Sequence, residues 1–260
     1  LVFGFNFNCP LDNALDNCTA LSILVFGSKF NHQLLNSLVN CTSLTILVFG
    51  YCFNHPLAHS LNNCTALTHI KFGISFNCPL ADSLNNCTAL THIEFGICFN
   101  CPLDNALDKC TSLTHIKFSD AFNCPLDNCL NNCTSLTHLG LGFNYNQKVS
   151  IPSNVRSLSL NSNNGNYGDY LPDNIEEIEL KFNFNSKLCN LSSSIKKITF
   201  NIWSCYNEEL DCLPDGLELL QLPKYYVYQI QNIPHGLKKL ICSKDYKFIN
   251  DFFGIEVETY

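Results

Sequence analysis

The chain has 260 residues and a formal net charge of −7, and only 14% of its residues are charged against 46% hydrophobic. This length is enough for one or two domains with a sizeable core. The acidic balance and the single arginine, Arg156, argue against a nucleic-acid-binding protein. No run of about 18 apolar residues occurs, so we expect no membrane span. The sequence lacks methionine altogether, which suggests a fragment of a longer chain.

The sequence is built from internal repeats. Six consecutive 23-residue segments cover residues 1–138, and two of them read LVFGYCFNHPLAHSLNNCTALTH (47–69) and IKFGISFNCPLADSLNNCTALTH (70–92). Six diverged repeats of 19–22 residues follow over residues 139–250, and residues 251–260 lie outside the pattern as a C-terminal cap. Repeats of this length stack on one another, so we expect one continuous solenoid domain.

Each repeat contains a predicted strand and a return. The alternation Ile70-x-Phe72, ended by Gly73, is typical of a short strand. In the first six repeats, apolar residues such as Leu84 and Cys87 recur every three positions, which predicts a short helical or 3₁₀ return. Later repeats carry proline instead, as in LPDNI (171–175), which predicts a turn. The fold class is therefore an α/β repeat solenoid: a curved rod with a parallel sheet on one face and helical/3₁₀ or proline-turn returns on the other.

These motifs carry a family resemblance. The LxxLxL strand followed by a loop resembles the leucine-rich repeat family, and the segment NCTALTHIKF (63–72) is similar to BspA-like repeats. The recurrent FGxxFNxPL (72–80) is similar to the FNIP repeats of amoebae and giant viruses. The resemblance implies a protein-interaction module, and for FNIP repeats that follow an F-box, a substrate adaptor in ubiquitination. One departure is that Asn77 follows the second apolar residue of its strand, Phe72, by five residues, whereas the common leucine-rich repeat places its asparagine three residues after that apolar residue.

Equivalent positions of a solenoid stack into columns, which we interpret as structural ladders. An asparagine column can hydrogen-bond the neighbouring loop, a phenylalanine column can form a core spine, and a cysteine column can serve as small core filler. The ladder residues are Asn31, Asn54, Asn77, Asn100 and Asn123; Phe53, Phe76 and Phe99; and Cys41, Cys64, Cys87 and Cys110. We favour free thiols, because the parallel Cβ vectors of a column suit disulfides poorly.

Metal and catalytic sites are not predicted. A second column contains metal-ligand residue types, namely Cys9, His32, His55, Cys78, Cys101 and Cys124. A straight column does not converge tetrahedrally, as zinc requires, and no repeat places a base beside a nucleophile. We therefore expect a non-enzymatic protein without a cofactor. Asn-Cys-Thr triplets at Asn17, Asn40, Asn63, Asn86 and Asn132 match the glycosylation acceptor, but we favour copying of one repeat motif as their origin.

The outward strand positions are the candidate site. The residues expected to project from the exposed sheet face are His69, His92, His115 and His138, together with Lys71, Glu94 and Lys117. The simplest interpretation is a neutral polar row that only solvates the sheet. A surface that binds a protein partner is the alternative, and it is our hypothesis for the function of these residues. At the level of the whole chain, the alternative function is a structural surface protein of a virion or of cell adhesion.

The predicted compartment follows from the free thiols. They favour the cytoplasm, and an extracellular or virion surface is the alternative. The strand at Leu1 has an uncovered edge that could pair with another copy of the chain.

Overall fold

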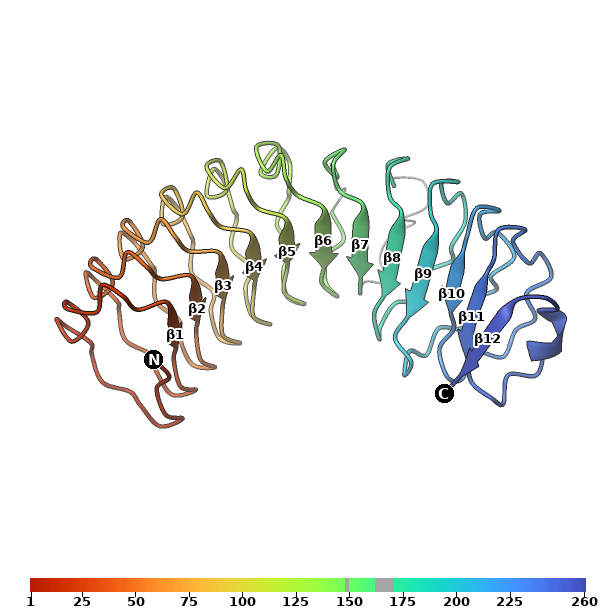
Figure 1. Cartoon of the computed structure of the whole chain (residues 1–260), viewed down its shortest axis with the longest axis horizontal. Coiled ribbons are helices and arrows are strands. Elements are labelled where there is room, and N and C mark those ends of the chain that lie inside the picture. The colour runs from red at the N-terminus through yellow and green to blue at the C-terminus, as the bar shows by residue number, and fades with distance from the viewer. Residues whose placement is uncertain (148–149, 162–170) are drawn as a thin grey trace. The chain divides into compact units, whose positions relative to one another are not determined.

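The computed structural model describes residues 1–147, 150–161 and 171–260. Its chain divides into two compact units, which we call unit 1 (Leu1–Thr137) and unit 2 (His138–Tyr260). Within each unit, short parallel strands lie side by side in sequence order, and the chain returns from one strand to the next on the opposite face (Figure 1). The predicted solenoid with a parallel sheet on one face is confirmed.

Unit 1 contains five strands in its described residues, one in each repeat after the first. They are β1 (Ile23–Val25), β2 (Ile46–Val48), β3 (His69–Lys71), β4 (His92–Glu94) and β5 (His115–Lys117). Neighbours pair in parallel with equivalent residues opposite each other, as Ile70 opposite Ile93. Val2 adds a single parallel bridge to Val25. The central residue of each strand is buried and its two neighbours face outward, as expected for a period of two.

Unit 2 continues the same pattern with slightly longer strands. They are β6 (His138–Leu141), β7 (Ser157–Leu160), β8 (Glu177–Leu180), β9 (Lys197–Phe200), β10 (Leu219–Gln221), β11 (Lys239–Cys242) and β12 (Glu256–Thr259). A 3₁₀-helix, η2 (Ile249–Asp251), precedes the last strand. The predicted cap segment thus supplies β12, which pairs in parallel with β11.

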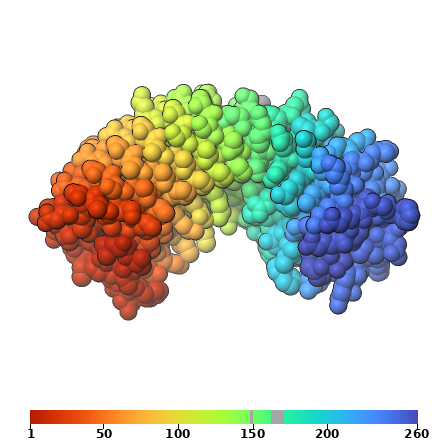
Figure 2. Space-filling view, viewed as in Figure 1, coloured from red at the N-terminus to blue at the C-terminus, as the bar shows by residue number. Residues whose placement is uncertain are grey.

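The core of unit 1 is a stack of identical layers. In every complete layer the strand leucine or isoleucine, the two phenylalanines and the return cysteine are buried. The phenylalanine rings of successive repeats stack nearly parallel. On the surface of unit 1, the side chains of successive repeats lie in direct contact on the side shown in Figure 2. The centroid spacing between repeats widens from the sheet face to the loop: 4.2 Å for His69–His92, 5.3 Å for Phe72–Phe95 and 5.9 Å for Phe76–Phe99. Unit 1 therefore curves with its strands on the inside.

The returns of unit 1 are not the helical or 3₁₀ segments that the sequence predicted. In the described residues they are successive turns, whose N–H···O=C bonds join Ser83 to Leu80, Asn85 to Asp82 and Cys87 to Leu84. A 3₁₀-helix needs such bonds at consecutive residues, whereas these fall at every second residue. Ala81 has a φ of 45°, and its counterparts in four other repeats, Asp12, Leu35, Ala58 and Asp104, have values between 41° and 48°. This left-handed residue interrupts any right-handed helix.

Glycine is required where the strand ends, because adjacent repeats approach closely there. A Cβ added at Gly73 would lie 1.7 Å from the carbonyl oxygen of Gly50. No atom pair tolerates that distance, so the glycine permits the close contact of consecutive backbones. In the last repeat of unit 1 the equivalent residue is Ser119, whose hydroxyl donates a hydrogen bond to the carbonyl of Phe99.

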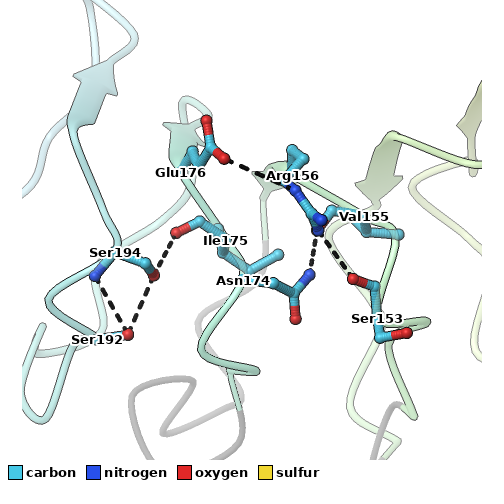
Figure 3. A network of polar contacts seen from close by, with 8 residues as sticks. All are labelled: Ser153, Val155, Arg156, Asn174, Ile175, Glu176, Ser192 and Ser194. Atoms are coloured by element: carbon cyan, nitrogen blue, oxygen red, sulfur yellow. Dashed lines mark hydrogen bonds and ion pairs between the residues drawn. The ribbon is translucent and has the colours of Figure 1, made fainter.

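The returns of unit 2 are joined by polar side chains (Figure 3). The amide of Asn174 donates to the carbonyl of Val155, and the hydroxyl of Ser194 donates to the carbonyl of Ile175 at 2.7 Å. Turn bonds such as Ile175 N–H to the Pro172 carbonyl close each return. These side chains hydrogen-bond backbone carbonyls where the chain turns away from the sheet.

Candidate functional site

The outward face of unit 1 consists of two parallel rows. The first row consists of the first residue of each strand: Ile23, Ile46, His69, His92 and His115. The second row is Val25, Val48, Lys71, Glu94 and Lys117. The structure therefore brings together six of the predicted site residues in unit 1. The seventh, His138, begins β6 in unit 2, where its register partner is Ser157.

The histidines of the first row are held in one orientation. Their rings stack with centroids 4.2 and 4.3 Å apart and planes inclined by 11°. Each ring nitrogen Nδ1 lies 2.8–2.9 Å from the hydroxyl of the preceding threonine, Thr68, Thr91 or Thr114. That hydroxyl donates its own proton to a threonine carbonyl of the previous repeat. The threonine oxygen therefore accepts a hydrogen bond from Nδ1–H of the ring, which holds each imidazole in a fixed orientation.

The second row contains a short chain of ion pairs. Glu94 lies between two lysines, 2.8 Å from Lys71 Nζ and 2.8 Å from Lys117 Nζ. Partial burial raises the pKa of Glu94, but the hydrogen bonds and charges of Lys117 and Lys71 outweigh it and hold the pKa below its ordinary value. Two cations share one carboxylate, so the row keeps a net positive charge.

Sequence reasoning missed an aliphatic patch on the same face. Its members are Ile23, Val25, Ile46 and Val48, which occupy in β1 and β2 the positions taken by histidine and charged residues in β3–β5. Ile23 is exposed and the other three are partly exposed. The signal was available in the sequence, because these residues align with His69 and Lys71 at the 23-residue period. Solvent-facing aliphatic side chains in a cluster are typical of an interaction surface.

A second exposed feature of unit 1 follows the strand-ending glycines. We call Tyr51, Ile74 and Ile97 the ledge. Tyr51 and Ile97 are each more than half exposed. A groove of about 340 Å³ joins the ledge to the charged row, and its lining includes Lys71, Ile74, Glu94, Ile97, Lys117 and Asp120.

Unit 2 offers a more polar face. A groove of about 490 Å³ is lined by residues that include Ser157, Glu177, Glu179, Lys197, Thr199 and Gln221. Opposite charges alternate between strands, with Lys197 3.4 Å from Glu177 and Lys239 2.7 Å from Glu258. Beside this groove, the Lys224 ammonium lies 4.7 Å from the ring centroid of the exposed Trp203.

The asparagine column makes regular contacts between repeats. The backbone N–H groups of Asn54, Asn77, Asn100 and Asn123 donate to the side-chain oxygen of the asparagine 23 residues earlier, at 2.8–3.0 Å. A second set of asparagine side chains, which match the glycosylation acceptor in the sequence, also joins the repeats. Asn40, Asn63 and Asn86 each donate from the side chain to a backbone carbonyl of the previous repeat at 2.9 Å. Both sets join consecutive loops.

The cysteine column of unit 1 is deeply buried. Burial raises the pKa of the Cys64 and Cys87 thiols to about 12 and that of Cys110 to about 11. Their thiolates are therefore disfavoured as nucleophiles or metal ligands. Among the residues that the structure describes, no three histidine, cysteine or acidic side chains form a metal cluster. In the same residues, no helix is long and apolar enough to cross a membrane.

Comparison with known proteins gives the fold. No protein-family model and no curated protein matches the sequence. Among solved structures, CroV588, a circular leucine-rich-repeat protein, is 23% identical with a TM-score of 0.56, and the match covers 94% of this chain and 47% of CroV588. The internalin InlF of Listeria monocytogenes is 16% identical with a TM-score of 0.60, over 94% of this chain and 73% of InlF. TLR13, solved in complex with ssRNA13, is 16% identical with a TM-score of 0.51, over 85% of this chain and 33% of TLR13.

The chain thus spans about half the length of CroV588 and a third of TLR13. At these identities the likeness concerns the fold, and it agrees with the parallel strands and buried leucine columns of both units. The protein folds as a parallel β-solenoid similar to those of leucine-rich-repeat proteins.

Proposed function

We propose that this chain is a non-catalytic interaction module whose outward sheet face in unit 1 binds a partner protein. The observation that carries the proposal is the composition of that face. Aliphatic side chains on β1 and β2 adjoin three oriented imidazoles and the row of Lys71, Glu94 and Lys117. An apolar patch next to polar and charged groups is a common composition of a protein interface.

A site-specific cross-link tests this proposal. A photo-reactive amino acid replaces Val48 on the outward face, and in a control chain it replaces Thr88, which is exposed on a return. After irradiation in an extract of the native host, we expect a defined cross-linked partner with the Val48 chain only. The Ile46→Lys substitution, placed beside the probe, should abolish it. Equal labelling from Thr88, or labelling that Ile46→Lys leaves unchanged, would contradict the proposal.

A finer role as a substrate adaptor rests on the resemblance to FNIP repeats. It would require an F-box in the longer protein, and co-purification of the full-length protein with the ubiquitin-ligase machinery tests it. An RNA partner, as in the TLR13 structure, is disfavoured by the net charge of −7.

The alternative is a structural repeat protein at a cell or virion surface. The observation in its favour is the regularity of unit 1, in which asparagine, phenylalanine and cysteine columns continue through successive repeats without interruption. Such an array would be oxidised outside the cell. Counting free thiols in the denatured native protein separates the two: mostly disulfides would favour the surface role.

A further inference from the structure

We propose that the ledge of unit 1, with the adjacent charged row, binds an amphipathic α-helix of a partner protein. One flank of this helix carries acidic, basic and acidic residues, in that order. This inference rests on the proposed interaction function and names the chemistry of the partner. The helix would lie across the strand ends, with its apolar side chains on Tyr51, Ile74 and Ile97.

The ledge is a rigid platform. The carbonyl groups of Tyr51, Ile74 and Ile97 accept hydrogen bonds from Ser75, Cys98 and Ala121 of the following repeats, at 2.9, 3.0 and 3.1 Å. The buried Phe72 and Phe95 precede it in the chain, and Phe76 and Phe99 follow it. The exposed apolar side chains therefore keep a fixed spacing, and binding loses little backbone entropy on this side of the interface.

The repeat spacing on either side of the ledge is closer to the pitch of a helix than to the spacing of same-side residues in a strand. Ring centroids next to the ledge are 5.3–5.7 Å apart along the strand column and 5.9–6.1 Å apart along the loop column. An α-helix repeats every 5.4 Å, so residues i, i+4 and i+7 meet successive repeats. An extended strand presents same-side residues about 6.6–6.8 Å apart and loses register over three repeats. Polyproline II, at about 3.1 Å per residue and three residues per turn, repeats about every 9 Å and fits less well.

The charged row defines the flank of this helix. Lys71, Glu94 and Lys117 occupy consecutive repeats and share the groove with Ile74 and Ile97. The row lies on β3–β5 and the ledge follows β2–β4, so the charged flank is shifted by one repeat relative to the apolar contacts. A flank that carries acidic, basic and acidic residues one turn apart, with this shift, would place opposite charges on all three. The reverse order would place like charges on all three. The row thus supplies specificity in addition to the apolar contact.

Variation among the copied repeats points to the same position. The residue after the strand-ending position reads Phe5, Ser28, Tyr51, Ile74, Ile97 and Asp120 through the six repeats. The packing positions on either side keep phenylalanine in all six copies. Within one molecule, the stacking requirement therefore leaves this exposed position free to differ. Three consecutive apolar residues at a free, solvent-facing position are not required for stacking, and a partner would account for them.

A selection experiment tests the helix and its charge order together. The probe is a displayed library on a stable helical scaffold, with leucine or phenylalanine fixed at i, i+4 and i+7 and with three flank positions randomised among Glu, Lys and Gln. Selection on the whole chain should yield Glu-Lys-Glu flanks. These binders should bind about tenfold tighter than the matched Lys-Glu-Lys scaffold, because each of three exposed ion pairs contributes a factor of about two.

Two variants of the chain complete the test. Ile97→Asn should weaken the selected binders at least about tenfold, since it removes an exposed apolar anchor that shares the groove with the charged row. The charge-swapped chain, Lys71→Glu with Glu94→Lys and Lys117→Glu, keeps its internal ion pairs and should select Lys-Glu-Lys flanks instead. Identical flanks on both chains, binders insensitive to Ile97→Asn, or an absence of helical binders would overturn the inference. A positive cross-link from Val48 alongside any of these results would leave the interaction function standing and remove only the helix proposal.

Discussion

Removal of the Phe76 ring should strongly destabilise unit 1. The side chain is completely buried, and its centroid lies 4.2 Å from Phe72, 5.9 Å from Phe99 and 6.1 Å from Phe53. Replacing a core phenylalanine with alanine costs about 3–5 kcal/mol through lost burial and the remaining cavity. Stacked rings contribute about 0.5–1.5 kcal/mol per pair beyond burial. With stacked neighbours on three sides, we expect the Phe76→Ala substitution to cost about 5 kcal/mol.

Urea unfolding followed by circular dichroism measures this cost, and Phe5→Ala serves as the matched control. Phe5 is 64% exposed and its substitution should cost below about 0.5 kcal/mol. Because a solenoid repeat contacts only its neighbours, hydrogen exchange should accelerate first in β2–β4. A cost for Phe76→Ala no greater than that for Phe5→Ala would refute the inference that this column carries the packing energy of unit 1.

Three further predictions concern the stacking contacts. Gly73→Ala should destabilise the chain by about 1–3 kcal/mol or more, because the added Cβ would clash with the Gly50 carbonyl. Gly4→Ala, whose Cβ would have no atom within 4 Å, should be tolerated, and thermal melting of both variants checks this. Asn77→Ala should cost about 1 kcal/mol by removing the acceptor for Asn100 N–H, and Asn77→Asp, which keeps an acceptor, should cost less in the same urea assay. The free energy of unfolding should fall as pH rises from about 9 towards 12, because the Cys64 and Cys87 thiols stay protonated in the folded chain but ionise in the unfolded chain. Urea unfolding at pH 7 and pH 10 measures this difference, and a chain with both residues changed to Ala should lose less stability between the two pH values.

The parts of the fold that repeat were predictable from the sequence. Alternation around Ile70 and Phe72 indicated a strand with one face buried, and the 23-residue period placed equivalent residues opposite each other, as Ile70 and Ile93 are. Periodicity identifies such positions because every copy meets the same environment. The pairing of Lys71 and Lys117 with Glu94 also follows from that register.

The prediction of helical or 3₁₀ returns was wrong, because the spacing of apolar residues does not determine backbone geometry. Leu84, Cys87 and Leu90 are buried as a helical face would be. The backbone instead forms turn hydrogen bonds at every second residue. Ala81 adopts a left-handed conformation, which the conformational preference of alanine does not predict. The aliphatic patch and the ledge were not predicted from the sequence for a different reason. Apolar residues are usually assigned to the core, and only the structure places Ile23 and Ile97 in solvent.

Comparison of the copies within one chain bears on the two candidate functions. A purely structural array needs matching stacking surfaces, and its outward residues need only be soluble. In unit 1 the outward second row instead passes from Val25 and Val48 to Lys71, Glu94 and Lys117, while the buried phenylalanines next to it do not change. Solubility alone would not place valine on this solvent-facing row or isoleucine on the ledge. The outward differences between otherwise uniform repeats therefore favour recognition of a partner over a passive structural role.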